Sequence, residues 1–213
     1  MGINKRYIAV EGPIGVGKTT LARRIASSIG AGLILEQPAD NPFLERFYKY
    51  PSQYALQTQL HFLFQRVQQL KSLRQGDLFT PIQIADYMLA KDPIFARLTL
   101  DDDEFDLYEK VYQHLNDTVP TPDLVIYLQA PLDLLAARIH KRGIMYERNI
   151  ERQYLHRLSE AYAQFFLNYR DSALLMVNAE NVDFMENEEH YALLLKEIQV
   201  IASGRHYFNP VLP

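Results

Sequence analysis

A glycine-rich segment near the start of the chain has the spacing of a phosphate-binding loop. Residues 12–19 have the sequence GPIGVGKT, which matches the pattern G-x-x-x-x-G-K-S/T. In such a loop the backbone N–H groups surround a phosphate chain, because the glycines place no Cβ in the way. The lysine reaches the β- and γ-phosphates, and the hydroxyl that follows it ligates Mg²⁺. The residues expected to bind a nucleotide in this way are Gly12, Gly15, Val16, Gly17, Lys18, Thr19 and Thr20.

Two acidic residues stand at the ends of short apolar runs. Glu36 follows Leu33-Ile34-Leu35, and Asp86 follows the run 81–85. Both runs have the composition of strands, and in open α/β sheets ligands lie beyond the carboxyl ends of the strands. We therefore expect Glu36 to face the phosphate loop and Asp86 to lie at the same edge of the sheet.

The elements that must position these residues alternate along the chain. Strands are predicted at 7–10, 33–36, 81–86, 123–128 and 174–177, and helices at 20–29, 42–48, 52–73, 88–98, 103–115, 132–142, 149–168 and 188–202. Alternating strands and helices favour a parallel sheet covered on both faces. We predict an α/β fold of the P-loop NTPase type, with three α/β/α layers, about five parallel strands and residues 1–213 as a single domain.

Composition limits the possible partners. The chain has 213 residues, a net charge of −4 and no cysteine. The lack of basic excess disfavours a nucleic-acid polymer as partner, and the lack of cysteine fits a reducing compartment. The N-terminus lacks the apolar stretch of a signal peptide, and no later run approaches the length of a membrane span. We expect a cytoplasmic protein without a membrane partner.

The phosphate loop alone leaves several reactions open. A GTP switch should carry a guanine-reading N-K-x-D segment, but the Asn-Lys pair of this chain, Asn4-Lys5, precedes the first strand. A motor ATPase should have adjacent acids after a strand, where this chain has Gln129-Ala130. A phosphotransferase remains. The cations Arg138, Lys141, Arg142 and Arg148 suit a helical lid over ATP phosphates, at about residues 138–150.

Motifs along most of the chain resemble those of the deoxynucleoside kinases, in particular the bacterial deoxyguanosine and deoxyadenosine kinases. The segments that carry the resemblance are 9–20, 41–44 with Phe47-Tyr48, 85–87, 94–96, 126–128 and 138–143. The resemblance implies a kinase for nucleotide salvage that uses ATP and Mg²⁺ to phosphorylate the 5′-hydroxyl of deoxynucleosides, with purine deoxynucleosides favoured. It also implies a homodimer.

The resemblance assigns roles to particular residues. Glu36 would be the general base for the 5′-hydroxyl, which agrees with its expected place at the sheet edge. Tyr48 and Glu147 would hold the 3′-hydroxyl, and Gln59 and Arg66 the base, since the spacing from Tyr48 favours Gln59 over Gln57. Lys18, Arg138 and Arg142 would neutralise phosphate charge, while Thr19 and Asp86 would hold the metal. Up to two of the aromatic residues Phe43, Tyr54, Phe62 and Phe95 are expected to stack on the base.

Two departures from the family pattern keep alternatives open. Many relatives have an arginine directly after the acid of the third strand, where this chain has Tyr87, and a third lid arginine where it has Ile144. A donor near the 5′-oxygen is therefore missing or comes from elsewhere. One alternative is a thymidylate-like nucleoside-monophosphate kinase, which would use the cations Arg46, Arg66 and Arg97 to hold the phosphate of its acceptor. Another is a regulatory module that binds ATP without turnover, against which the retention of Glu36 weighs.

Overall fold

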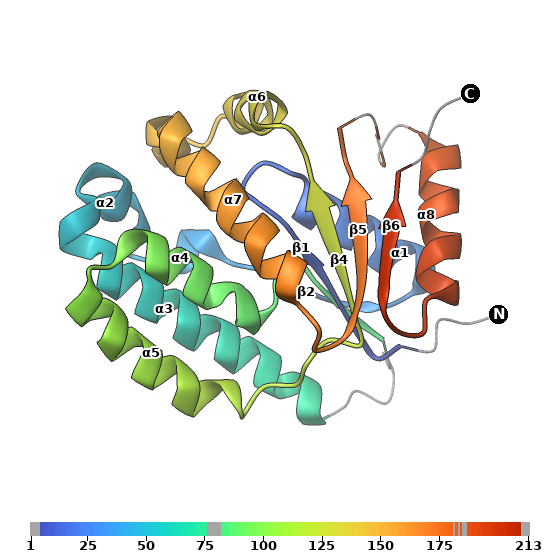
Figure 1. The fold of residues 1–213 in the computed structure, drawn as a ribbon, viewed down its shortest axis with the longest axis horizontal. Coiled ribbons are helices and arrows are strands. Elements are labelled where there is room, and N and C mark those ends of the chain that lie inside the picture. Colours follow the sequence, from blue (N-terminus) through green and yellow to red (C-terminus); the bar gives the residue numbers. More distant parts are fainter. Residues whose placement is uncertain (1–4, 76–81, 181, 183, 185–186, 210–213) are drawn as a thin grey trace.

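Six parallel strands form the central sheet of the computed structural model, which describes residues 5–75, 82–180, 182, 184 and 187–209. The strands are β1 (Tyr7–Glu11), β2 (Gly32–Ile34), β3 (Gln83–Ala85), β4 (Leu124–Gln129), β5 (Ala173–Asn178) and β6 (Arg205–Phe208). Their order is β2-β3-β1-β4-β5-β6 (Figure 1), and every neighbouring pair is parallel. The strand that precedes the phosphate loop, β1, therefore lies inside the sheet, between β3 and β4.

The helices cover both faces of this sheet (Figure 1). They are α1 (Lys18–Ile29), α2 (Leu44–Lys49), α3 (Pro51–Lys71), α4 (Asp92–Thr99), α5 (Asp102–Asn116), α6 (Leu132–Arg142), α7 (Arg152–Asn168) and α8 (Glu188–Val200). Short 3₁₀ turns occur at Pro38–Asp40, Ser72–Gln75, Leu89–Lys91 and Tyr146–Asn149. The predicted three-layer α/β/α architecture is confirmed.

The alternation of side chains along β1 supplies two separate cores. Ile8 and Val10 are fully buried on one face, in a cluster with residues of α1, α6 and α8. Tyr7 and Ala9 point to the other face, in a cluster with residues of α3, α4, α5 and α7. Successive side chains of a strand point to opposite faces, so a strand that is apolar throughout belongs inside such a sheet. The phosphate loop that follows β1 is thus held from both sides.

Two elements differ from the prediction. The sixth strand, β6, was not predicted because Arg205–Phe208 contains charged and polar residues, and of its four side chains only Phe208 is buried. The helix predicted from Met88 begins instead at Asp92, after an extended Met88 and a 3₁₀ turn. Pro93 occupies the first turn of α4, where its missing N–H is not needed. Pro81, the predicted first residue of the third strand, lies outside the described residues.

The acidic run at residues 101–104 forms the start of α5. The Asp101 side chain accepts a hydrogen bond from the backbone N–H of Glu104, and the Glu104 side chain accepts one from the N–H of Asp101. This reciprocal capping box satisfies N–H groups that the helix leaves unpaired. The acids therefore have a structural role at the N-terminus of the helix.

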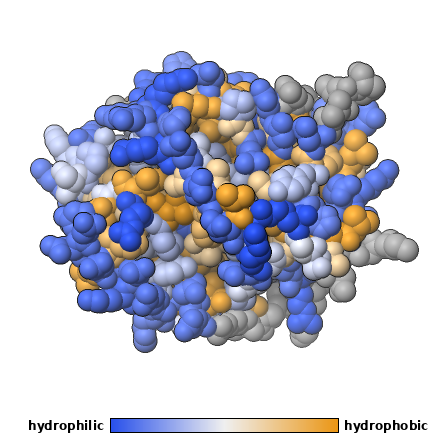
Figure 2. Space-filling view, in the orientation of Figure 1, coloured by the Kyte–Doolittle hydropathy of each residue, from blue (hydrophilic) through white to orange (hydrophobic). Residues whose placement is uncertain are grey.

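The surface is largely hydrophilic, with apolar side chains gathered in patches between polar ones (Figure 2). Large exposed apolar side chains include Phe64 on α3, Leu107 on α5 and Leu167 on α7. Within the described ranges, the helices are too short or too polar to cross a membrane.

Candidate active site

The phosphate loop joins β1 to α1 and depends on its glycines. Gly12, Gly15 and Gly17 have φ angles of 147°, 85° and 105°, which L side chains rarely adopt. A Cβ on Gly12 would lie 2.5 Å from the backbone oxygen of Leu128, and one on Gly15 would lie 2.8 Å from the oxygen of Leu135. The loop is therefore packed tightly against β4 and α6.

The cations around the loop contact backbone oxygens. Lys18 Nζ donates hydrogen bonds to Gly12 O at 2.7 Å and Pro13 O at 3.2 Å. From α6, Arg138 Nη1 donates to Val16 O at 3.1 Å. Burial lowers the pKa of Lys18 to about 8, and the nearby charge of Lys91 adds to this shift. Among the described residues, Lys18 and Arg138 have no carboxylate hydrogen-bond partner. A bound anion can therefore replace the backbone oxygens that these two side chains contact.

Two cavities meet at the phosphate loop. The first, which we call the donor cavity, has a volume of about 440 Å³ and is lined by the loop, the cationic face of α6 and the apolar residues Val182 and Phe184. The second, the acceptor cavity, has a volume of about 380 Å³ and extends from the loop to α3 and the 3₁₀ turn at Tyr146–Asn149. Both cavities are lined by Gly15, Lys18, Thr19 and Arg142. Two ligands could therefore approach each other across the loop.

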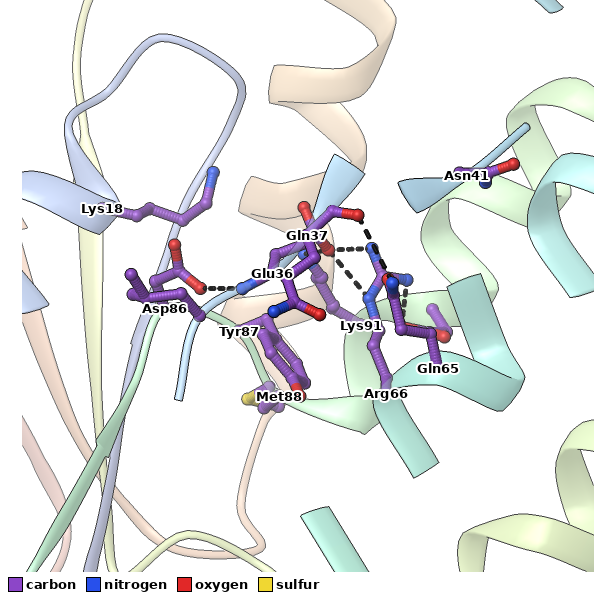
Figure 3. Close-up of polar contacts among 12 residues, drawn as sticks. Lys18, Glu36, Gln37, Asn41, Gln65, Arg66, Asp86, Tyr87, Met88 and Lys91 are labelled. Carbon is purple, nitrogen blue, oxygen red and sulfur yellow. Dashed lines mark hydrogen bonds and ion pairs between the residues drawn. The ribbon is translucent and has the colours of Figure 1, made fainter. Parts of the chain in front are cut away.

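Asp86 ties the loop to the chain beyond β2. Its Oδ2 accepts a hydrogen bond from Thr19 Oγ1 at 2.5 Å, and its Oδ1 accepts one from the backbone N–H of Glu36 at 2.8 Å (Figure 3). Glu36 lies two residues past the end of β2, so this bond fixes the backbone that carries it. The hydroxyl of Thr19 and the carboxylate of Asp86 are oxygen ligands of the kind that Mg²⁺ prefers, and this ion needs few ligands from the protein. The pair fits the metal role expected for it.

Glu36 is the centre of a group of ion pairs. Its Oε1 accepts hydrogen bonds from Nε of Arg66, at 2.8 Å, and from Nη2 of the same side chain. Figure 3 shows Arg66 against Glu36; its Nη1 also donates to Asp92 Oδ1 at 2.7 Å, so Arg66 bridges two carboxylates. Burial would raise the pKa of Glu36, but the charges of Arg66 and Lys91 outweigh it and lower this pKa to about 2. Glu36 is therefore ionised at neutral pH.

Lys91 and Asp92 were not singled out from the sequence. Lys91 Nζ lies 3.6 Å from Glu36 Oε1 and 3.8 Å from Oε1 of Glu11, the last residue of β1. Asp92 is 1% exposed, and within the described residues its Oδ2 has no hydrogen-bond partner. In the sequence, Lys91 and Asp92 stand directly before Pro93, a pattern that indicates the start of a helix. This pattern does not distinguish a buried pair of charges from a solvated one.

The residues expected at the sugar lie together near the 3₁₀ turn at Tyr146–Asn149. Glu147 accepts hydrogen bonds from Arg142 Nε at 3.0 Å and from Nη2 at 2.5 Å. Tyr48 stacks on Tyr146 with ring centroids 5.6 Å apart. Tyr48, Tyr146, Glu147 and Arg142 all line the acceptor cavity, and so does Ile144, at the position where many relatives have an arginine.

The residues expected at the base line the far end of the same cavity. Gln59 is 5% exposed and its Nε2 donates a hydrogen bond to Thr99 Oγ1 at 3.2 Å, while Gln57 is exposed. Of the four aromatic candidates, Phe62 and Phe95 line the cavity. Phe43 instead meets His61 edge to face, and Tyr54 packs under Arg46, so neither is placed to stack on a ligand here.

Several other candidates lie outside both cavities. Arg97 is 63% exposed and contacts Asp102 and the ring of Phe105. Arg46 lies over the Tyr54 ring, and Arg148 is exposed. Of the three cations named for an acceptor phosphate, Arg66 lines the acceptor cavity, where it is paired with Glu36 and Asp92, and Arg46 and Arg97 do not. Tyr87 is fully buried, and its hydroxyl donates to Gln69 Oε1 at 2.5 Å, away from the loop.

Comparisons with known proteins agree with this geometry. The family model described as "Deoxynucleoside kinase" matches residues 8–203 of this chain. Deoxyguanosine kinase of Bacillus subtilis (strain 168) is 36% identical over 206 residues, which cover 91% of this chain and 98% of the relative. Deoxyadenosine kinase of Lactobacillus acidophilus is 28% identical over 207 residues, which cover 91% and 94%.

Solved structures give the same result. The deoxyadenosine kinase from M. mycoides with bound dCTP aligns with a TM-score of 0.79 at 27% identity and covers 92% of this chain and 100% of that chain. The same kinase with the products dCMP and a flexible dCDP aligns with a TM-score of 0.81. Because the family model spans almost the whole sequence and the fold agrees, this chain belongs to the deoxynucleoside kinase family.

Proposed function

We propose that this protein transfers the γ-phosphate of ATP to the 5′-hydroxyl of a purine deoxynucleoside, for nucleotide salvage. The observation that carries the proposal is the charge state of the acceptor cavity. Its cations besides Lys18 are already ion-paired, Arg66 and Lys91 near Glu36 and Arg142 with Glu147. A cavity whose charges balance one another suits an uncharged acceptor such as a nucleoside, since a phosphate would need unpaired positive charge.

The transfer needs a base, and we assign this role to Glu36, which lines the acceptor cavity beside Lys18 and Thr19. As the 5′-oxygen bonds to the γ-phosphorus, its proton passes to the Glu36 carboxylate, and the bond to the β–γ bridging oxygen breaks with its electron pair on ADP. Lys18 and Arg138 neutralise the phosphate charge, and Arg142, which lines both cavities, joins them when a phosphate replaces its contact with Glu147. Thr19 and Asp86 would hold Mg²⁺, which would offset further charge on the phosphates.

The remaining acceptor residues hold the nucleoside. Gln59 presents a donor and an acceptor to one edge of the base, next to Arg66 in the lining of the cavity. Tyr48 and Glu147 receive the 3′-hydroxyl. The preference for purines is supported by the names of similar proteins, which are deoxyguanosine and deoxyadenosine kinases.

Assembly and location are part of the same proposal. We propose a homodimer, as the family resemblance implies, and a cytoplasmic location, which the lack of cysteine fits. Exposed Phe64, Leu107 and Leu167 are apolar groups that an interface would cover. Light scattering after size-exclusion chromatography measures the mass directly, and a monomer at micromolar concentration contradicts the dimer.

An ADP-release assay with Mg-ATP tests the reaction. The four natural deoxynucleosides are compared with their 5′-monophosphates at equal concentrations. We expect turnover on deoxyguanosine or deoxyadenosine and none above background on any monophosphate. Turnover on monophosphates alone contradicts the proposal and indicates a monophosphate kinase. Silence on all acceptors, with ATP still bound in a titration, contradicts it in favour of a regulatory module.

A further inference from the structure

Five charged side chains, all buried except the partly exposed Glu36, form a chain from the end of β1, beside the phosphate loop, to the start of α4. In order they are Glu11, Lys91, Glu36, Arg66 and Asp92, in which acids and bases alternate. Glu36 is the middle member and has a cation on either side. Arg66 approaches it from α3, and Lys91 approaches it from the 3₁₀ turn before α4 (Figure 3).

The contacts of Glu36 are unevenly divided between its two oxygens. Both hydrogen bonds from Arg66 and the approach of Lys91 are made to Oε1. Within the described residues, Oε2 accepts no hydrogen bond, and the side chain is 22% exposed in the wall of the acceptor cavity. One oxygen is therefore held by cations while the other is left for a ligand.

Lys91 is held in this position by its surroundings. The residue is 1% exposed, and its ammonium lies 5.3 Å from the centre of the Phe95 ring. Its second carboxylate, Glu11, is fixed in turn, since it accepts hydrogen bonds from the backbone N–H groups of Gly12 and Met88 and from the Tyr162 hydroxyl. Burial raises the pKa of Glu11, but the charge of Lys91 and these donors favour its ionised form. Lys91 is thus tied to the strand that carries the phosphate loop.

Arg66 and Lys91 differ in what else they contact. Arg66 also bonds Asp92, and it lines the cavity together with Gln59, a residue expected at the base. A bound base can draw Arg66 toward it and away from Glu36. At the base end Lys91 contacts only the ring of Phe95 among the described residues, and its other carboxylate partner is Glu11, which belongs to β1. The distances from Lys91 to the two carboxylates exceed a hydrogen bond, so its N–H donors remain open to a further oxygen.

We propose that Lys91 is the positioning residue for Glu36, which it holds by Oε1 so that Oε2 meets the 5′-hydroxyl. Lys91 supplies the positive charge near the acceptor oxygen that Tyr87 does not. The inference rests on the proposed function. The proton passes from the hydroxyl to Oε2 of Glu36, the oxygen bonds to the γ-phosphorus of ATP, and ADP leaves with the electron pair.

Steady-state kinetics of Lys91→Met and Lys91→Arg test this role. Methionine keeps the length of the side chain without its charge. Because misplacement of a catalytic group by about 1 Å costs roughly 100-fold, we expect kcat to fall about 100-fold in K91M. The KM for the deoxynucleoside and the Kd for ATP should change less than about threefold, and K91R should recover most of the lost kcat. Lys196→Met, at an exposed site on α8, is the matched control.

Loss of Lys91 also leaves Glu11 without its cation, so a structural role must be separated from positioning. A double-mutant cycle with Glu36→Gln does this. If Lys91 acts through Glu36, the double variant is no slower than E36Q alone, because the group that Lys91 positions is already gone. If the two losses multiply, Lys91 acts elsewhere and the proposal is overturned. Melting curves of all variants identify any that do not fold.

The wild-type assay separates this proposal from the one on which it rests. Absence of wild-type turnover on every deoxynucleoside overturns the proposed function and the role of Lys91 with it. Wild-type turnover together with K91M within about threefold in kcat overturns the role of Lys91 alone. An equal loss of nucleoside binding and kcat in K91M also overturns it, since a positioning residue acts on the chemical step.

Discussion

The donor and acceptor sides of the phosphate loop use their charges in opposite ways. On the donor side, Lys18 and Arg138 bond backbone oxygens of the loop and its surroundings. On the acceptor side, Arg66 bonds the carboxylates of Glu36 and Asp92. Lys91 lies near the carboxylates of Glu36 and Glu11. Lys18 and Arg138 thus make their hydrogen bonds to backbone carbonyl dipoles, whereas Arg66 and Lys91 are paired with carboxylates.

This difference matches the charge of the ligand that we propose for each side. A triphosphate brings negative charge that unpaired cations can neutralise, and it displaces hydrogen bonds that the loop makes with itself. A nucleoside brings no charge, so the acceptor side must balance its own. A buried charge without a partner is costly, and the alternation of acids and bases from Glu11 to Asp92 avoids that cost. The variants below test this contrast, from the largest expected effect to the smallest.

The largest effect is expected from Glu36→Gln. The substitution keeps the size of the side chain but removes the base, so kcat should fall by roughly 10²–10⁴-fold. ATP should bind with unchanged Kd in a titration, because the donor cations are untouched. Glu45→Gln, at the exposed pair with Lys49, is the control. Turnover equal to that of the wild type would remove Glu36 from the mechanism.

Arg66→Met tests the balance of charges on the acceptor side. It leaves the Asp92 carboxylate, which is 1% exposed, without its hydrogen-bonded cation. Breaking a buried ion pair from one side typically costs about 3–5 kcal/mol, and chemical denaturation measures this loss in the free energy of unfolding. Arg97→Met breaks the exposed pair with Asp102 and should cost less than about 1 kcal/mol. Equal losses in the two variants would show that the acceptor charges do not depend on each other.

Arg138→Met tests the independence of the donor side. Loss of a hydrogen bond from a charged group costs about 1.5–3 kcal/mol, which corresponds to a fall of roughly 10- to 100-fold in kcat/KM for ATP. The KM for the deoxynucleoside should not change, since Arg138 does not line the acceptor cavity. Arg23→Met, on the exposed face of α1, serves as control. A rise in both KM values would contradict the separation of the two sides.

The same contrast explains how much of the site the sequence predicts. On the donor side, the phosphate loop, its lysine and the hydroxyl that follows form one continuous segment with fixed spacing. A sequence pattern finds such a segment directly. Strand-end acids are also predictable, because the edge of a parallel sheet collects them, as it does Glu36 and Asp86. The fold follows from the alternation of strands and helices, apart from β6, whose short polar sequence has no strand pattern.

The acceptor charges are less accessible to the sequence because their partners are distant along it. Arg66 and Arg97 have the same residue type, yet one is buried between two carboxylates and the other is on the surface. Lys91 and Asp92 become significant only when β1, β2 and α3 are brought together around them. Ion pairs between helices and strands depend on how closely these elements pack in the fold. A single sequence shows only residue types and the spacing of apolar and polar residues within each element.

The smallest effect is expected from Gln59→Leu at the base end of the acceptor cavity. In this variant the Thr99 hydroxyl no longer accepts a hydrogen bond from residue 59. It still donates one to Phe95 O at 2.8 Å, so the fold should be little affected. A neutral hydrogen bond contributes about 0.5–1.5 kcal/mol, and the KM for the deoxynucleoside should therefore rise about 2- to 10-fold while the KM for ATP stays the same. Gln57→Leu, at an exposed site on the same helix, is the control. If Q59L changes neither KM, the base is read elsewhere, and Arg66 with Asp92 becomes the next pair to vary.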